Sequence, residues 1–468
     1  MTNRTGSRRR GARRSAPGAA TFQHPAIEMR DIDRLSPNAR NARRHSRKQI
    51  RQIAASIERF GFTVPIVVDE HGTILAGHGR VEAAKHLGLP SVPVIALSHL
   101  SEPEKRAYVL ADNKLALNAG WDREILAIEL GALIELDFEV ELTGFETPEI
   151  DLLFAGEQAK KRDPDPGEDK VREIDRSAAP VSRAGDVWEL GSHRLICGSA
   201  LDEAAYATVM SGERARMVVT DPPYNLAVSF IRGMGRSRHR EFAMASGEMS
   251  EAQFVEFLAR AHALTLAHSE AGALHFVFMG WQHLREALNA GQGVYGDLVQ
   301  LVVWDKLSAG MGGLYRNQHE LVLVWKVPGA SSLNNVELGK HGRNRSNVWS
   351  HRGLAGFGKE RDEDLAAHPT VKPAALIADA LRDASKPRDV VLDPFAGSGT
   401  ILLAAEATGR RARAIEIDAH FCDVALARWE HKTGKRARLA AVGLSFEEIG
   451  ELRSNDETNE STGEGRAA

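Results

Sequence analysis

The segment MVVTDPPYNL, residues 217–226, has the pattern of a buried strand that ends in a rigid turn. Its apolar start is typical of a parallel strand that is covered on both faces. Pro222 and Pro223 end this strand, because proline donates no backbone N–H and restricts the residue before it. We therefore expect Asp221 and Tyr224 at the carboxyl end of a strand, where open α/β sheets bind their ligands.

This corner has the groups needed for chemistry on an amine. A carboxylate and a proline carbonyl can accept the two protons of an exocyclic amine, which localises the nitrogen lone pair for attack on an electrophilic methyl group. The ring of Tyr224 can stack on the base that carries the amine, once this base has been turned out of the duplex. For an isolated D-P-P-Y motif, a structural turn with a helix-capping aspartate is the alternative.

A second motif follows in DVVLDPFAGSGTILLAAEATG, residues 389–409. It predicts another buried strand, and Gly397 and Gly399 then let the backbone turn tightly and approach a ligand before a helix begins near Thr400. The next strand, RARAIEID, ends with Glu416, whose carboxylate can accept the two hydroxyls of a ribose. These features predict a site for a cofactor that carries a nucleoside.

On these residues the chain resembles an amino-methylating DNA methyltransferase of the permuted, β-type order, in which D-P-P-Y precedes F-x-G-x-G. HPTVKP, residues 368–373, stands just before the second motif, as it does in that family. The resemblance implies an α/β fold with a Rossmann-like methyltransferase domain over residues 181–450. Seven predicted strands match the family's mostly parallel sheet with one reversed strand and helices on both faces.

The resemblance also implies roles for individual residues. Asp221 and the carbonyl of Pro222 would orient the amine, Pro223 completes the motif, and Tyr224 would stack on the base. The residues implied for binding S-adenosyl-L-methionine are Asp393, Phe395, Gly397, Ser398, Gly399, Glu416, His368, Thr370 and Lys372. Those implied for the DNA and the base pocket are Tyr315, Arg316, His319, Glu320 and Arg236. A structural hydrogen-bond network, or a solvated insertion around Arg236, is the alternative for this second set.

One strand departs from the family pattern. The predicted strand that ends at Cys197 is followed in the family by Gly-Asp-Ser, but here by Gly198, Ser199 and Ala200. The acid that the family places near the adenine of the cofactor is therefore absent from this position. Asp202 is the candidate substitute.

Residues 27–100 resemble the ParB/sulfiredoxin-like domain through IERFGF and PIVVDEHGTILAGHGRVEAAKHLG. A helix is expected within residues 49–62, where Gly61 breaks it, and another from Val81. Members of this group bind nucleotide phosphate in the turn between strand and helix, and the resemblance implies this turn for Gly77, His78, Gly79 and Arg80. A glycine turn that opens a helix suits an anion, although a purely structural turn is the alternative.

The remaining segments connect or extend these two domains. Residues 1–26 carry six arginines and no acid, which predicts a disordered tail that is either solvated or holds DNA phosphates. Residues 101–155 predict two or three helices, which either contact DNA or close the first core. Residues 156–180 have the composition of a charged linker, and the polar residues 451–468 predict a disordered tail.

Composition limits the class of protein. The 468 residues suggest two or three domains, and no stretch approaches the roughly 20 apolar residues of a membrane span. Because the net charge is −3, any basic surface that binds DNA must be local. Two cysteines, Cys197 and Cys422, exclude a disulfide framework and a cysteine-rich zinc site. We expect a reduced, cytoplasmic protein without a membrane partner.

We therefore predict S-adenosylmethionine-dependent methylation of double-stranded DNA without a metal ion, at adenine N6. Family members that act on cytosine N4 more often carry serine at the position of Asp221. Cytosine N4 is the close alternative, and a ParB-like DNA-binding or nucleotide-binding protein with an inactive methyltransferase half is the distant one. The region that would read the DNA site, residues 339–365, is short. Site choice is therefore shared with residues 227–248, the N-terminal domain or the second subunit of a homodimer.

Overall fold

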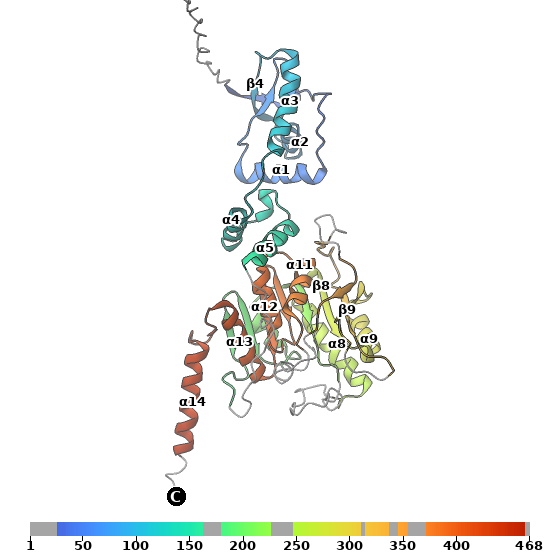
Figure 1. Ribbon diagram of the computed structural model, residues 1–468, viewed down its shortest axis with the longest axis vertical. Helices are drawn as coiled ribbons and strands as arrows, with labels where there is room; N and C mark the ends of the chain where they lie inside the picture. The colour runs from blue at the N-terminus through green and yellow to red at the C-terminus, as the bar shows by residue number, and fades with distance from the viewer. Residues whose placement is uncertain are drawn as a thin grey trace, which may run out of the picture. The chain divides into compact units, whose positions relative to one another are not determined.

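The chain divides into two compact units (Figure 1). The first comprises Met1–Asp122 with Glu139–Phe145, and the second Arg123–Phe138 with Glu146–Ala468. The computed structural model describes residues 26–161, 179–225, 247–309, 314–336, 345–353 and 371–463. None of the described helices combines the length and the apolar sequence that a membrane crossing requires.

The first unit is built on a four-stranded sheet with the order β1-β4-β2-β3. Strands β2 and β4 run parallel, whereas the β1–β4 and β2–β3 pairs are antiparallel. The strands are β1 (Ile27–Asp31), β2 (Ile66–Val68), β3 (Ile74–Ala76) and β4 (Ser91–Ala96), and the helices are α1 (Arg47–Phe60), α2 (His78–His86) and α3 (Glu102–Leu117). As the sequence predicts, α1 ends at Gly61, which has a positive φ of 82°.

The start of α2 differs from the prediction. The sequence predicts a turn through Arg80 and a helix from Val81, but the helix begins at His78. Only Gly77, with φ of 98°, has the left-handed conformation, and its carbonyl accepts the N–H of Val81. Since one glycine makes the whole turn, the next three residues already form the first helical turn.

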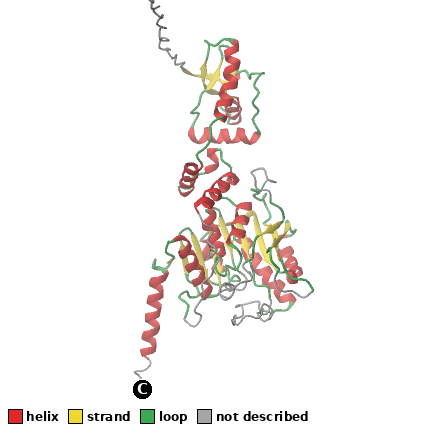
Figure 2. Cartoon of the chain, in the orientation of Figure 1, coloured by secondary structure: helices red, strands yellow, loops and turns green. Residues whose placement is uncertain are grey.

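The second unit is an α/β sandwich around a sheet of ten described strands in the order β11-β9-β10-β8-β7-β12-β13-β6-β5-β14 (Figure 2). The strands are β5 (Val187–Leu190), β6 (His193–Cys197), β7 (Ala215–Thr220), β8 (Ser269–Met279), β9 (Gln300–Asp305), β10 (His319–Lys326), β11 (Val348–Ser350), β12 (Val390–Asp393), β13 (Arg411–Glu416) and β14 (Arg438–Leu439). The seven neighbouring strands from β9 to β6 in this spatial order are the predicted ones, which confirms the predicted sheet. Strand β10 is the reversed strand. The short strands β11 and β14 are additions that the sequence does not predict.

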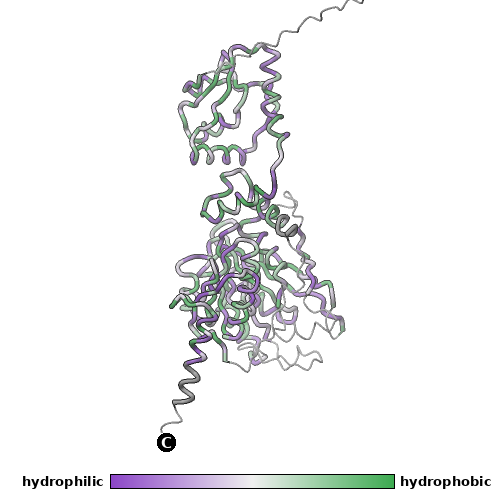
Figure 3. The backbone as a smooth tube through the Cα atoms, turned by 60° about the vertical axis from the view of Figure 1, so that its left-hand side comes forward, coloured by the Kyte–Doolittle hydropathy of each residue, from purple (hydrophilic) through white to green (hydrophobic). Residues whose placement is uncertain are grey.

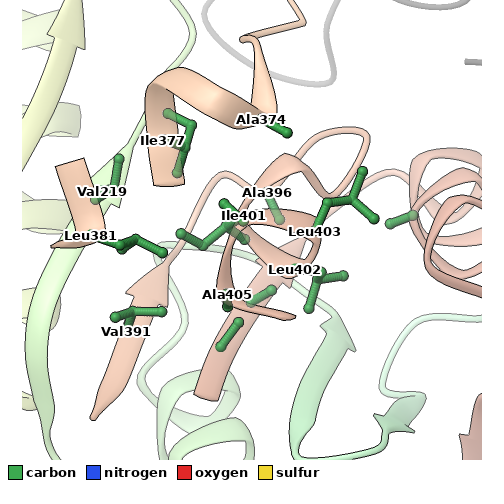
Figure 4. Close-up of a cluster of buried hydrophobic side chains, with 14 of the residues drawn as sticks. Val219, Ala374, Ile377, Leu381, Val391, Ala396, Ile401, Leu402, Leu403 and Ala405 are labelled. Carbon is green, nitrogen blue, oxygen red and sulfur yellow. The ribbon is translucent and has the colours of Figure 1, made fainter. Parts of the chain in front are cut away.

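Helices cover both faces of this sheet. They are α6 (Glu203–Met210), α8 (Glu251–Ala267), α9 (Leu284–Tyr295), α11 (Ala374–Ala384), α12 (Thr400–Thr408) and α13 (Ala419–Thr433). Helix α14 (Phe446–Gly463) follows β14 and extends away from the sheet (Figure 1). Val219 and Val391 pack against α11 and α12, where Leu381 and Ile401 meet them (Figure 4). Val218, the neighbour of Val219, packs on the opposite face with α6. Side chains of a strand alternate between faces, so each buried strand contributes to two cores. Apolar segments accordingly run through the interior of this unit (Figure 3).

Two helices precede this sheet, α4 (Arg123–Glu135) and α5 (Thr147–Lys161). Helix α5 continues past Gly156, where the sequence predicts a linker, and residues 162–178 of that linker lie outside the described residues. Arg410 fixes α5 to the sheet, since its Nη1 and Nη2 atoms lie 2.6 and 2.9 Å from the two carboxylate oxygens of Asp151. Because Arg410 directly precedes β13, α5 lies at the amino edge of the parallel strands.

The C-terminal segment also differs from the prediction. The sequence predicts disorder from Glu451, but α14 extends through Gly463. The guanidinium group of Arg453 donates to both carboxylate oxygens of Asp186 and to the carbonyl of Val181. Local composition does not reveal this anchor, because its partners lie more than 260 residues earlier in the chain.

Candidate active site

The predicted catalytic and cofactor motifs meet at the carboxyl edge of the parallel strands. Asp221 follows β7, Asp393 ends β12 and Glu416 ends β13, and these strands are neighbours or next neighbours in the sheet. Glu320 reaches the same edge from the start of β10, because this strand runs in the opposite direction. The sheet order therefore collects acidic groups from four strands on one side of the unit.

Asp221 uses both of its carboxylate oxygens. The hydroxyl of Tyr224 donates to Oδ1 at 2.7 Å, and the ammonium group of Lys372 donates to Oδ2 at 2.5 Å. Burial raises the pKa of Asp221, although the charge of Lys372 opposes this rise. Asp221 thus pairs with an ammonium group in a site where burial favours its neutral form.

Glu320 joins the same network. Its carboxylate accepts a hydrogen bond from Tyr224 at 3.3 Å and lies 3.2 Å from the ammonium group of Lys372 and 2.5 Å from that of Lys306. Burial alone would raise the pKa of Glu320, but the two ammonium groups outweigh it and hold this pKa at about 2. Burial disfavours the charged form of Lys372 too, yet Asp221 and Glu320 outweigh it and raise the pKa of this lysine. The network thus carries two negative charges, on Asp221 and Glu320, and two positive charges, on Lys306 and Lys372.

Aromatic rings surround the Lys372 ammonium group. Its nitrogen lies 5.3 Å from the ring centroid of Phe278, 5.7 Å from that of Tyr224 and 5.9 Å from that of Trp304. These distances allow cation–π attraction, which favours a positive charge between ring faces. Flat rings beside a hydrogen-bond acceptor are also the surroundings that a nucleobase with an exocyclic amine requires.

The glycine turn after β12 is sterically fixed. Gly397 and Gly399 have positive φ values of 52° and 78°. A Cβ atom on Gly399 would lie 2.5 Å from the Cβ of Ala425, which is far inside van der Waals contact. The turn therefore depends on glycine at this position, and it brings the backbone close to the start of α12.

Two buried carboxyl groups flank this turn. Glu416 accepts the N–H of Gly397 at 2.7 Å and that of Asp418 at 2.8 Å, and burial raises its pKa to about 7. Asp393 accepts the hydroxyl of Thr220 at 2.8 Å and the N–H of Phe395 at 3.0 Å, and burial raises its pKa to about 7.

The other predicted cofactor residues have different surroundings. The ring of Phe395 packs against that of Phe257, with 5.9 Å between centroids. The carbonyl and hydroxyl oxygens of Ser398 accept hydrogen bonds from Arg428. Lys372, which the sequence groups with the cofactor site, donates a hydrogen bond to Asp221. His368 and Thr370 lie outside the described residues.

The structure separates the predicted base-pocket residues. Glu320 lies in the site, but the side chain of Tyr315 is 81% exposed. Arg316 is exposed and donates to the carbonyl of Ala309, and His319 is exposed at the start of β10. Arg236 lies outside the described residues. Asp202, the suggested substitute near the adenine, caps α6 by accepting the N–H of Ala204.

Sequence reasoning misses Lys306, Trp304, Phe278 and Thr220. Trp304 and Lys306 stand at the end of β9, and Phe278 lies near the end of β8, so the sheet order alone brings them to Asp221. The available signal is that each stands at the carboxyl end of a predicted strand, where ligands bind in such sheets.

The N-terminal unit has a smaller basic site around α2. The Nε atom of Arg80 is buried and makes no hydrogen bond within the described residues. His78 accepts the N–H of Asn38 through Nε2 at 3.3 Å, and a Cβ atom on Gly79 would lie 3.1 Å from the ring of His45. Burial lowers the pKa values of both His78 and Arg80. An anion at this helix start would compensate the desolvated guanidinium group.

Comparisons with known proteins identify both parts of the chain. Residues 18–114 match the model of the ParB N-terminal domain, residues 124–184 that of the ParB-methyltransferase HTH domain, and residues 215–427 that of the DNA methylase family. The ParB-like nuclease domain-containing protein YnaK of Escherichia coli is 51% identical over 80 residues, which are 17% of this chain and 92% of that protein. The chain belongs to the ParB-like family and carries a DNA methylase domain.

Relatives of the methylase part match this ParB–methylase fusion over a smaller share of their own length. The type II methyltransferase M.HinfI of Haemophilus influenzae is 36% identical over 133 residues, 26% of this chain and 37% of that protein. The fusion thus spans little more than a third of the length of that relative. The crystal structure of the M1.HpyAVI–SAM complex matches with a TM-score of 0.36 at 18% identity, over 50% of this chain and 98% of that one.

Proposed function

We propose that this ParB–methylase fusion is a site-specific DNA methyltransferase that transfers a methyl group from S-adenosylmethionine to N6 of an adenine turned out of double-stranded DNA. The observation that carries this proposal is the position of Asp221 and Tyr224 at the same sheet edge as the glycine turn and Glu416. An amine acceptor, a stacking ring and a nucleoside-binding turn are the parts that this reaction needs.

The residues at the glycine turn fit the cofactor. S-adenosylmethionine supplies a sulfonium-bound methyl group that is electrophilic. Gly397 and Gly399 allow a close approach of the backbone, and Glu416 ends β13 with a buried carboxylate that can exchange its backbone partners for two ribose hydroxyls. Phe395 and Asp393 shape the neighbouring end of this site, and His368, Thr370 and Lys372 precede it in the chain.

Asp221 and Pro222 activate the amine. One N–H donates to the carboxylate of Asp221 and the other to the carbonyl of Pro222, which leaves the nitrogen lone pair directed at the methyl carbon. A nitrogen–carbon bond then forms as the carbon–sulfur bond breaks, and the surplus proton of the methylated amine passes to Asp221. Tyr224 holds the base by stacking. The rate derives from orientation and from charge stabilisation in a site with little water.

Labelled product analysis tests this function. The protein is incubated with unmethylated DNA and S-adenosylmethionine labelled in its methyl group, and the digested nucleosides are separated by mass spectrometry. We expect labelled N6-methyladenine with the wild type and with Asp297→Ala, an exposed acid of the same unit, and a loss of at least 100-fold with Asp221→Ala. Labelled N4-methylcytosine would support the mechanism but change the target base to cytosine. No label on any DNA would refute the proposed methyltransferase activity.

We infer a second function for the turn at Gly77 to Arg80, namely nucleotide phosphate binding. The buried Nε of Arg80 without a partner among the described residues supports it. Calorimetric titration of the protein with the four ribonucleoside triphosphates tests it. We expect one nucleotide to bind, with affinity reduced at least 10-fold in Arg80→Ala and unchanged in the exposed control Arg51→Ala. Equal affinity of all three proteins would contradict this role.

A further inference from the structure

We propose that Lys372 is a positioning residue that occupies the amine-accepting side of Asp221 in the free protein and transfers to Glu320 when the target base enters. The inference rests on the proposed methylation, since it concerns the same acceptor. It assigns to this lysine a role distinct from the cofactor contact that its sequence motif implies.

The first step of the argument is occupancy. Both oxygens of Asp221 already accept a hydrogen bond, from Lys372 at 2.5 Å and from Tyr224 at 2.7 Å. The Lys372 ammonium group is an N–H donor, as the target amine is, and its side chain is only 6% exposed. The position that the amine must take is therefore filled by an N–H donor of the protein itself.

The second step is the position of the rings. The nitrogen of Lys372 lies within 6 Å of the ring centroids of Tyr224, Phe278 and Trp304. A base that stacks on Tyr224 and donates its amine to Asp221 needs the space between these rings. The lysine therefore has to move before the base can be seated.

The third step is the destination. Glu320 already lies 3.2 Å from the Lys372 nitrogen, so a small movement of the side-chain end exchanges one carboxylate partner for the other. Lys306 holds Glu320 in place from its other side at 2.5 Å. Because Lys372 stays paired with Glu320 throughout the exchange, it never becomes an unpaired buried charge.

The network also has an electrostatic signature. Burial raises the pKa of Asp221, the charge of Lys372 lowers it and the charge of Glu320 raises it further. Among the described residues, the other titratable groups beside Asp221 are Tyr224, which stays neutral, and Asp393 on β12. Removing the lysine charge should therefore move the titration of Asp221 to higher pH, and removing the charge of Glu320 should move it to lower pH.

The pH dependence of methylation tests this signature. Only ionised Asp221 can accept the amine, so its titration contributes to the acidic limb of the profile of kcat, alongside that of Asp393 and Glu416. We expect this limb to move up by about one pH unit or more in Lys372→Met and down in Glu320→Gln, with partial return toward the wild type in Lys372→Arg. We also expect the KM for DNA to rise about 10-fold in Glu320→Gln, because Lys372 loses its second partner. A limb that moves the same way in both variants, or in neither, would overturn the proposal.

A measurement without turnover separates this inference from the proposed function. In ¹⁵N-lysine NMR spectra of the full chain, the Lys372 signal is the one that Lys372→Arg removes. It should shift in Asp221→Asn, and it should shift in the wild type when DNA carrying the methylated site is added with S-adenosylhomocysteine. If the enzyme is active but its Lys372 signal does not shift when this DNA is added, the inference about Lys372 is refuted and the proposed function stands. A wild type that methylates no DNA would refute the proposed function, and the inference with it.

Discussion

The buried ion pair between Arg410 and Asp151 permits a quantitative prediction about stability. The side chains are 0% and 2% exposed, and two hydrogen bonds of 2.6 and 2.9 Å join them. Asp151→Asn removes the negative charge and leaves the guanidinium group buried. Loss of one partner of such a pair costs about 3–5 kcal/mol. Arg410 keeps its bonds to the carbonyls of Ser385 and Thr408, so we expect the lower end, about 3 kcal/mol.

Urea unfolding of the full chain, followed by tryptophan fluorescence, measures this cost. The transition of the second unit should move to lower urea by about 1–1.5 M, given a slope of about 2–3 kcal/mol per M. Asp137→Asn is the matched control, because Asp137 pairs with Arg388 at 2.8 Å but is 78% exposed. This exposed pair should contribute less than about 1 kcal/mol. Equal shifts in the two variants would refute the reasoning from burial.

Two further predictions concern single side chains. Gly399→Ala should lower the free energy of unfolding by at least about 2 kcal/mol and weaken cofactor binding in calorimetry, because of its positive φ and the 2.5 Å approach to Ala425. The hydrogen bond from His193 and partners such as Lys435 outweigh burial and hold the pKa of Glu406 at about 2. Since this lies below its ordinary value, the stabilisation is present above about pH 4.5 and is lost as pH falls toward 2. In acid unfolding, the stability of Glu406→Gln should therefore lack the loss that Glu406 causes in the wild type between about pH 4.5 and 2.

The sequence predicts the central sheet well, because its strands are continuous apolar runs bounded by turn residues. It also predicts the order of the motifs, and strand ends bring Asp221 and Glu416 to one edge. The contact between Lys372 and Asp221 could not be predicted, since 151 residues separate them and only the sheet order unites them. The same holds for Arg410 and Asp151, which are 259 residues apart. Long-range ion pairs leave no periodic signal in the chain.

Tyr315 shows how little a sequence motif fixes outside a regular element. Its motif places it near Glu320 in the chain, but of the described residues in this motif only Glu320, on β10, contacts the site. Tyr315 precedes the strand and is exposed. Proximity in sequence to a site residue therefore predicts little outside a regular element, where the direction of each side chain is not fixed by the backbone period.

The continuation of α5 into the charged segment bears on how such genes recombine. A crossover within residues 156–180 looks harmless in the sequence, because composition there is that of a linker. Yet a crossover at that point would separate the methylase part from the helix whose acid neutralises its buried arginine. Exchange of the ParB-like part between lineages should therefore leave its junctions ahead of Thr147, so that α5 is inherited together with the sheet it is attached to.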